Sequence, residues 1–144
     1  MSKLVKIKRF DKDIPLPAYK TKGAAAFDLC ARNSVQIPPK ELGYIPLNVA
    51  IETPPGCFLL VAPRSSTHKK GLIMANSIGI GDPDFSGDAD EYHAVYYNFT
   101  DKSVLVERGE RIAQALIIKR ETIRWKEVDK MENKTRGGWG TTGK

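Results

Sequence analysis

The sequence predicts an all-β protein of many short strands, arranged as a sandwich or jelly roll. Short segments of alternating or continuous apolar residues recur along most of the chain. Turn clusters separate them at short intervals, among them IPPKELG, TPPG, FTDKS and ERGE. No long apolar stripe with 3.6-residue spacing and caps at both ends is present, so helices are not expected to form the core.

Five segments carry the strand signals. Residues 44–52 alternate apolar and other residues, and residues 57–63 form a short apolar run that ends in proline. Residues 92–99 are rich in aromatic and β-branched side chains, and residues 103–107 alternate again. Residues 111–119 are the most densely apolar of the five. We expect a strand from each.

Length and composition indicate a single domain of ordinary type. A chain of 144 residues is long enough to bury about 68–70% of the surface of its unfolded form. No apolar run approaches the length of about 20 residues that crosses a bilayer, and the N-terminal segment does not resemble a signal peptide. We therefore expect a soluble cytoplasmic protein, with Cys30 and Cys57 reduced.

The net charge of +6 suggests an anionic partner. The basic residues are scattered, and no ribonucleoprotein motif or long basic block is present, so a phosphate-bearing small molecule fits better than a nucleic-acid groove. An ordinary basic surface explains the charge equally well. We expect no membrane partner and no stable binding of nucleic acid.

The last eleven residues, 134–144, differ from everything before them. They read KTRGGWGTTGK, which is too rich in glycine to form a strand core, so we expect a β domain over residues 1–133 followed by a flexible arm. Gly138 to Lys144 match the spacing of a phosphate-binding loop. The motif requires a following Ser or Thr and a helix, and the printed sequence has neither, so the match carries no weight.

Residues 76–88, NSIGIGDPDFSGD, gather acidic residues and glycines in an otherwise basic chain. Asp and Gly are common turn formers, so this stretch alone is compatible with an ordinary hairpin. Elsewhere, Arg64, Ser65 and Ser66 follow an apolar run and offer a guanidinium group and hydroxyls to an oxyanion. Gln114 lies within an apolar strand, as a satisfied core group or as a ligand contact.

Two further polar features bear on metal binding. Asp28 lies between apolar neighbours, where a half-buried carboxylate needs a partner that a capped turn or a metal-bound water could supply. The cysteines and histidines show none of the spacings of structural zinc sites. A zinc centre is therefore not expected.

The order of these weak signals is more specific than any one of them. AAAFDLCA, PRSS, NSIGIGDPDFSGD, RGERIAQALI and RGGWGTTG follow one another over nearly the whole chain. This set resembles the five motifs of the trimeric dUTPase family. The resemblance implies a β-clip jelly roll that forms a homotrimer, with active sites at the subunit interfaces, and hydrolysis of dUTP to dUMP and pyrophosphate. That activity limits uracil in DNA and supplies dUMP for dTMP synthesis.

The resemblance also implies residue roles. Asp82 would be the general base that activates the attacking water. Asn76, Gly79 and the hairpin backbone would bind uracil, and Phe85 would pack on the deoxyribose and exclude a 2′-hydroxyl. Mg²⁺ would be held mainly by the triphosphate, with Asp28 contacting it through water. The phosphates would be held by residues of the β domain, namely Arg64, Ser65, Ser66 and Gln114. In the arm, Arg136, Thr141 and Thr142 would bind the γ-phosphate, Trp139 would cover the base, and Gly140 would also contact the substrate.

The sequence departs from the family pattern at four positions and in one length. Phe85 stands where tyrosine is commoner, Trp139 replaces phenylalanine, Gly81 replaces an Ile or Val, and Ala26 replaces a glycine. The segment GDADEYHAVYYN is about three residues longer than usual. No charged catalytic group is lost, so these changes bear on rate and specificity.

Two alternatives remain at this point. A dCTP deaminase shares the jelly roll and the Arg-Ser loop, but its glutamate would fall at Val95, and Glu91 lies in the extended segment. A nucleotide-gated binding protein on the same fold is the second. Release of pyrophosphate from dUTP separates both from the hydrolase.

Overall fold

The structure, a computed structural model, describes the whole chain apart from residues 1, 142 and 144. Within that part of the chain it consists of strands and one short 3₁₀ helix, η1, which confirms the all-β prediction. The elements are β1 (Lys6–Arg9), β2 (Phe27–Cys30), β3 (Val35–Ile37), β4 (Leu42–Pro46), β5 (Val49–Glu52), β6 (Cys57–Ala62), η1 (Thr67–Lys70), β7 (Leu72–Met74), β8 (Gly79–Gly81), β9 (His93–Asn98), β10 (Val104–Val106) and β11 (Arg111–Lys119).

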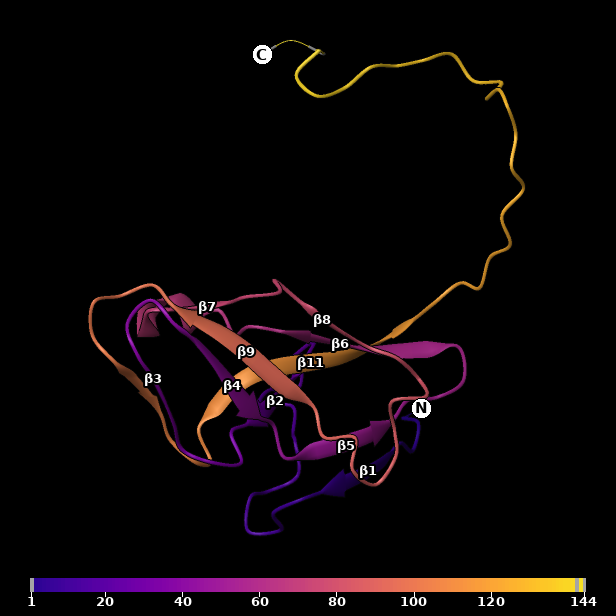
Figure 1. Cartoon of the computed structure of the whole chain (residues 1–144). Coiled ribbons are helices and arrows are strands. Elements are labelled where there is room, and N and C mark those ends of the chain that lie inside the picture. Colours follow the sequence, from indigo (N-terminus) through magenta and orange to yellow (C-terminus); the bar gives the residue numbers. More distant parts are fainter. Residues whose placement is uncertain (1, 142, 144) are drawn as a thin grey trace.

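The strands form small sheets that pack around one core (Figure 1). The largest has the order β2-β11-β6-β8, and a three-stranded sheet has the order β4-β9-β7. The pairs β1-β5 and β10-β3 complete the set, and all the pairings are antiparallel. Most sheet neighbours are distant in sequence, so the fold depends on long-range pairing.

The core lies between these sheets and is mostly apolar. Leu29, Ile45 and Leu59 are fully buried in it, each from a different strand. Tyr96 is also fully buried, and its hydroxyl donates a hydrogen bond to the carbonyl oxygen of Ile112 at 2.5 Å. Burial of this kind, worth roughly 25 cal/mol for each Å² of apolar surface, is the main source of stability.

The strand predictions were partly confirmed. The segment 111–119 is one strand with the predicted bounds, whereas the predicted strand 44–52 is divided into β4 and β5. The division occurs at Asn48, which has a φ of 71° and donates its backbone N–H to Glu91 at 2.9 Å. A left-handed residue cannot continue a strand, and Asn adopts this conformation more readily than most residues. Five shorter strands were not predicted: β1, β2, β3, β7 and β8.

The C-terminal segment leaves the β domain at the end of β11 and runs away from the strands (Figure 1). Within the described residues, its last hydrogen bond to the domain joins the backbone N–H of Arg120 to the carbonyl of Gly56 at 2.9 Å. The domain boundary at residue 133 stays a prediction. Among the described residues, no helix is long and apolar enough to cross a membrane.

Candidate active site

A cavity of about 380 Å³ lies between β8 and the start of β9, which flank the acidic turn. It is called the hairpin cavity or nucleoside cavity below. Four of its lining residues are predicted site residues: Asn76, Gly79 and Phe85 for the nucleoside, and Asp82 as the general base. The other lining residues are Val61, Ile80, Gly81, Glu91, Tyr92 and His93. The fold thus brings the predicted nucleoside-binding residues of this segment into one hollow.

Backbone groups line this cavity because its two walls are not paired with each other. In the described part of the chain, β8 pairs only with β6, through Gly79, Ile80 and Gly81. The pairing of β9 with β7 covers residues 96–98, and one further bond joins the Ala75 N–H to the Val95 carbonyl. Within the described residues, the unpaired edges of β8 and of the start of β9 therefore keep free backbone N–H and C=O groups. A bound ligand can supply the hydrogen-bond partners that these groups need when they are buried.

Asp82 occupies the turn between the walls. Its carbonyl accepts a hydrogen bond from the backbone N–H of Phe85 at 3.0 Å, which closes the turn. The Asp82 side chain is exposed, and the residue lines both this cavity and a neighbouring one of about 510 Å³. Asp84 lines only the neighbouring cavity, with Arg120. Asp82 is therefore the turn carboxylate that also borders the nucleoside cavity.

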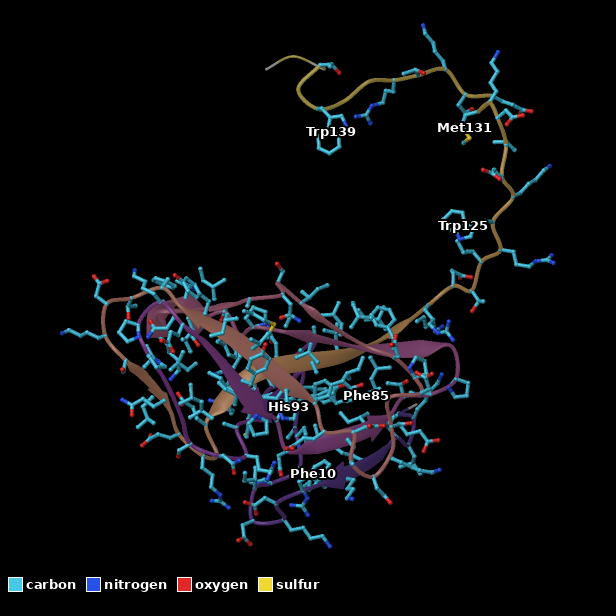
Figure 2. All side chains as sticks on the ribbon, in the orientation of Figure 1. Phe10, Phe85, His93, Trp125, Met131 and Trp139 are labelled. Atoms are coloured by element: carbon cyan, nitrogen blue, oxygen red, sulfur yellow. The ribbon has the colours of Figure 1, made fainter. Side chains whose placement is uncertain are left out.

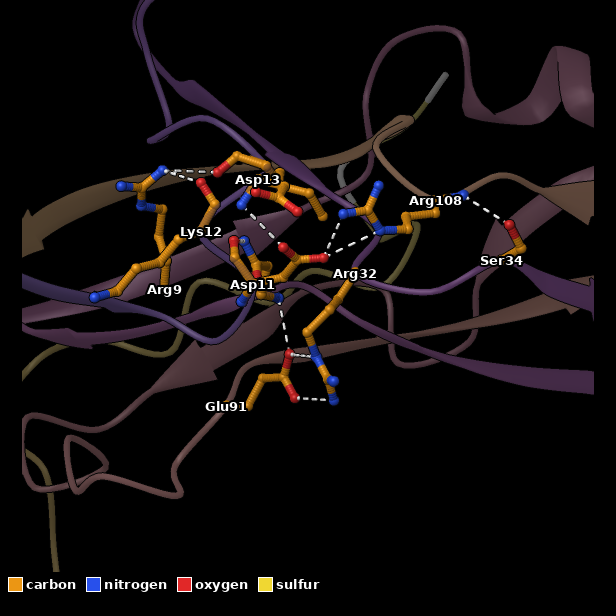
Figure 3. Close-up of polar contacts among 10 residues, drawn as sticks. Arg9, Asp11, Lys12, Asp13, Arg32, Ser34, Glu91 and Arg108 are labelled. Atoms are coloured by element: carbon orange, nitrogen blue, oxygen red, sulfur yellow. Dashed lines mark hydrogen bonds and ion pairs between the residues drawn. The ribbon is translucent and has the colours of Figure 1, made fainter.

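The extended segment is anchored to the domain by a buried carboxylate. Glu91 accepts a bidentate pair of hydrogen bonds from Arg32, at 2.7 and 2.9 Å, and a third from the backbone N–H of Asn48 (Figure 3). The paired carboxylate raises the pKa of Arg32. Close by, Arg108 donates to Asp11 and lowers the pKa of that carboxyl (Figure 3). Neither pair was predicted from the sequence.

A second polar cluster forms around Asp28 on β2. Arg64 Nε donates to Asp28 Oδ1 at 3.2 Å, and Arg111 Nη1 donates to Asp28 Oδ2 at 2.9 Å. Gln114 lies opposite Asp28 in the β11-β2 register, and its amide donates to the carbonyl of Pro63 at 2.9 Å. Three residues predicted to bind phosphate or metal are therefore close together. Arg111 was missed, although it lies in the RIAQ motif itself.

The residues on the loop after Arg64 offer hydroxyls at the surface. Ser65 is exposed, and Ser66 is half-buried at the start of η1, where its side chain makes no capping hydrogen bond. The Asp28 cluster borders a cavity of about 280 Å³ that shares no lining residue with the nucleoside cavity. Of the predicted phosphate and metal residues, Asp28 lines this second cavity, and Arg64, Ser65, Ser66 and Gln114 line neither of the two.

Metal ligands are few. The described residues contain no group of three or more His, Cys, Asp or Glu side chains that could hold an ion. Asp28 is the carboxylate nearest the predicted phosphate residues, and both of its oxygens already accept bonds from arginines. Burial raises the pKa of the neighbouring Cys30 thiol, which keeps it protonated. This donor set fits an ion held mostly by a ligand rather than by the protein.

The arm residues are not brought to either cavity. Arg136, Trp139, Gly140 and Thr141 are exposed, and Thr142 lies outside the described residues. Trp139 of the arm and Trp125 of the segment before it lie away from Phe85 and His93 on the domain (Figure 2). A tight turn forms near the end of the arm, where the Gly138 N–H donates to Thr141 Oγ1 at 2.7 Å.

Fold and site define a jelly-roll protein with a hairpin cavity and a separate Arg–Asp cluster. The sequence model of the dUTPase family matches residues 12–143. The deoxyuridine 5′-triphosphate nucleotidohydrolase of Dictyoglomus turgidum is 40% identical over 96% of this chain and 97% of its own, and the Hydrogenobaculum enzyme of that name is 38% identical over 95% and 96%. The chain belongs to the dUTPase family.

Solved structures agree on the fold. The dUTPase of Streptococcus mutans superposes with a TM-score of 0.76 at 28% identity, over 83% of this chain and 98% of its own. The dUTPase of Staphylococcus bacteriophage 80alpha, solved with dUPNHPP, gives a TM-score of 0.84 at 23% identity, over 99% of both chains. The predicted jelly-roll fold is thereby confirmed.

Proposed function

We propose that this protein is a dUTP diphosphatase, which cleaves dUTP with water into dUMP and pyrophosphate. The observation that carries the proposal is the single hairpin cavity that collects Asn76, Asp82 and Phe85 in a chain of the dUTPase family. Relatives that bear the name of this activity match nearly the full length of the chain.

Uracil is bound in the hairpin cavity. The open backbone edges of β8 and of the start of β9, with the exposed amide of Asn76, supply donors and acceptors. Cytosine carries an amino group where uracil carries an oxygen, so one donor–acceptor pattern cannot satisfy both bases. Phe85 packs on the deoxyribose and leaves no room for a 2′-hydroxyl. Specificity for dUTP over dCTP and UTP follows.

Asp82 is the general base. Its exposed carboxylate stands at the junction of two cavities, where it can take a proton from a water molecule. The water oxygen attacks the α-phosphorus, the bond from that phosphorus to the bridging oxygen breaks, and pyrophosphate leaves. Proton transfer of this kind contributes about 10²–10⁴ in rate.

The polyphosphate is held by the Asp28 cluster. Arg64, Ser65, Ser66 and Gln114 neutralise and orient it, with Arg111 fixing the carboxylate of Asp28. dUTPases depend on a metal, and the ion proposed here is Mg²⁺, which supplies charge neutralisation on the phosphate oxygens. Because both of its oxygens accept bonds from arginines, Asp28 would hold such an ion through a water molecule.

We further propose that the active form is a homotrimer with three sites at its subunit interfaces. None of Asp28, Arg64, Arg111 and Gln114 lines the hairpin cavity of its own chain, so residues from different subunits can complete one site. Leu42, Tyr44 and Ile73 lie exposed on the β4-β9-β7 sheet, where an interface would bury them.

The arm closes the site. Arg136, Trp139, Gly140, Thr141 and Thr142 fold over bound nucleotide, where Arg136 and the threonines contact the γ-phosphate and Trp139 covers the base. Exclusion of water strengthens these charge interactions. The exposed positions of the described arm residues are what such a lid requires before binding.

A pyrophosphate-release assay tests the proposal. Purified protein with Mg²⁺ is given dUTP, UTP, dCTP or dTTP, and rapid release from dUTP alone is the expected result. Equal rates on UTP and dUTP would remove the role given to Phe85. Ammonia release from dCTP would instead establish a deaminase, against which the bidentate bond of Glu91 to Arg32 already argues.

A further inference from the structure

Tyr92 is the largest side chain of the nucleoside cavity that the proposed reaction does not use. It is only 6% exposed, yet it lines the same cavity as Asp82 and Phe85. Its ring meets the ring of Phe85 edge to face, with centroids 5.2 Å apart and planes at 75°. The residue proposed to exclude ribose therefore rests on Tyr92.

Gly81 makes room for this ring. A Cβ added to Gly81 would meet the Tyr92 hydroxyl oxygen first and would lie 2.7 Å from Cε1 and 2.8 Å from Cζ, closer than real Cβ atoms approach their neighbours, so the ring alone excludes it. Gly81 is not among the residues with positive φ, so its backbone does not require glycine. The space taken by Tyr92 requires it. Gly81 and Tyr92 thus fit together only as a pair.

Tyr92 is buried and bonded through both of its backbone groups, whereas Phe85 is more exposed and is held by the turn bond from its N–H to Asp82. The Tyr92 N–H donates to the carbonyl of Val49 at 2.9 Å, and its own carbonyl accepts from Leu47 at 2.8 Å. The adjacent Glu91 is fixed by Arg32. Phe85 lies on a turn and is 38% exposed. The fixed ring is therefore the support, and the exposed ring is the part that needs support.

The Tyr92 hydroxyl takes no part in this support. It is the one buried side-chain polar atom without a hydrogen-bond partner among the described residues. Burial, followed by the charges of Asp82 and Asp90, raises the pKa of the phenol, so it stays neutral. Removal of an unpartnered hydroxyl breaks no bond, whereas removal of the ring leaves a cavity.

We propose that Tyr92 is a positioning residue that fixes Phe85 against the sugar and, paired with Gly81, sets the preference for deoxyribose over ribose. The proposal rests on the proposed function, since it concerns the sugar of dUTP. It assigns a purpose to the longer hairpin segment, which delivers Tyr92 to the cavity and anchors it through Glu91.

The test is a double-mutant cycle on Gly81 and Tyr92. kcat/KM is measured for dUTP and for UTP in the wild type, Tyr92→Val, Gly81→Val and the double variant. Loss of the aromatic pair in Tyr92→Val should lower the dUTP/UTP ratio by about two- to tenfold. Gly81→Val should lower it as well, because the ring is displaced. The double variant should recover part of the ratio, since the new valine occupies the vacated space.

Tyr92→Phe is the matched control, because it keeps the ring and removes only the hydroxyl. Its ratio should equal that of the wild type. A ratio lowered in Tyr92→Phe as much as in Tyr92→Val would overturn the proposal, and so would a double variant that shows only the sum of the single losses. Tyr92→Leu is made in parallel, so that a ratio is obtained if the valine variant does not fold.

Thermal unfolding of the same variants separates this proposal from the proposed function. If the wild type releases no pyrophosphate from dUTP, the proposed function is wrong, and the proposed role of Tyr92 in sugar preference is wrong with it. The unfolding midpoints would still show whether Gly81 and Tyr92 are coupled. Coupling predicts that the double variant is more stable than the sum of the two single-variant losses in stability.

Discussion

The hairpin cavity and the arm, which together make up the proposed site, differ in how they are held. The cavity is fixed by hydrogen bonds to the domain, and the arm is exposed. The hairpin cavity is formed in the free chain, closed by an Asp82–Phe85 turn bond and anchored through Glu91. Beyond Arg120, the described arm residues make no hydrogen bond to the domain, and Trp139 is fully exposed. The proposed function therefore places base recognition in a preorganised cavity and closure over the phosphates in a segment that orders upon binding.

From this difference we expect the cavity to determine substrate specificity and the arm to affect turnover. A rigid cavity discriminates through groups that are already in place, so changes there should alter the choice of substrate or the chemical step. A lid that orders only around bound nucleotide, as proposed for the arm, should leave stability unchanged when it is removed and reduce turnover. The predictions below test that separation, from the largest expected effect to the smallest.

Replacement of the general base should have the largest effect. Asp82→Asn should lower kcat by about 10²–10⁴, because the amide cannot accept the water proton. Affinity for a non-hydrolysable dUTP analogue, measured by calorimetry, should change little. Asp84→Asn is the matched control, since Asp84 does not line the nucleoside cavity. A greater loss of kcat in Asp84→Asn would show that the roles have been assigned to the wrong carboxylate.

Removal of residues 134–144 should abolish most turnover. We expect a loss of at least about tenfold in kcat/KM, because the γ-phosphate loses its contacts and the site stays open to water. The unfolding midpoint and the oligomeric state, followed by calorimetry and light scattering, should not change. In the full chain with Trp125→Phe, analogue binding should alter the emission of Trp139. A truncated protein with normal kcat would leave the arm without a catalytic role.

Disruption of the hairpin anchor should affect stability more than chemistry. Glu91→Gln leaves Arg32 with an incompletely paired charge, which we expect to lower the free energy of unfolding by about 2–4 kcal/mol. Urea unfolding measures this change. KM for dUTP should rise while kcat falls little, since Asp82 is untouched. A large fall in kcat at an unchanged KM would contradict an anchoring role.

The Asp11–Arg108 pair should contribute least, and in a pH-dependent manner. The bond from Arg108 lowers the folded-state pKa of Asp11 below its usual 3.8, so the pair stabilises the fold above that value. The contribution is lost as the pH falls through the lowered pKa. Asp11→Asn should therefore reduce the unfolding midpoint slightly at pH 7 and by less at pH 2. A difference that grows toward acid pH would show the opposite sign.

The sequence predicted the fold class because strand patterns and turn residues recur along the chain. It predicted β11 best, since nine consecutive residues carry one signal. The three-residue strands β7 and β8 escaped because so short a run contains less than two periods of alternation, and neither lies within a longer patterned segment as β10 does. The break at Asn48 also escaped, because it depends on Glu91, which is 43 residues away in sequence.

The candidate site was predicted through the order of its motifs, which brought Asp82, Asn76 and Phe85 together before any geometry was known. Arg111 and Tyr92 were missed for different reasons. Arg111 precedes Gln114 in a recognised motif, so its spacing was a usable signal. Tyr92 resembles any buried aromatic residue of a strand, and only the close approach to Gly81 distinguishes it.

Hydrogen exchange measured with and without a non-hydrolysable dUTP analogue tests the contrast between hairpin and arm most directly. Amides of β9 should already be protected in the free protein, because they pair with β4 and β7. Amides of residues 134–141 should exchange freely in the free protein and become protected only with the analogue. If the arm is protected without nucleotide, or if β9 exchanges as fast as the arm, the account is contradicted.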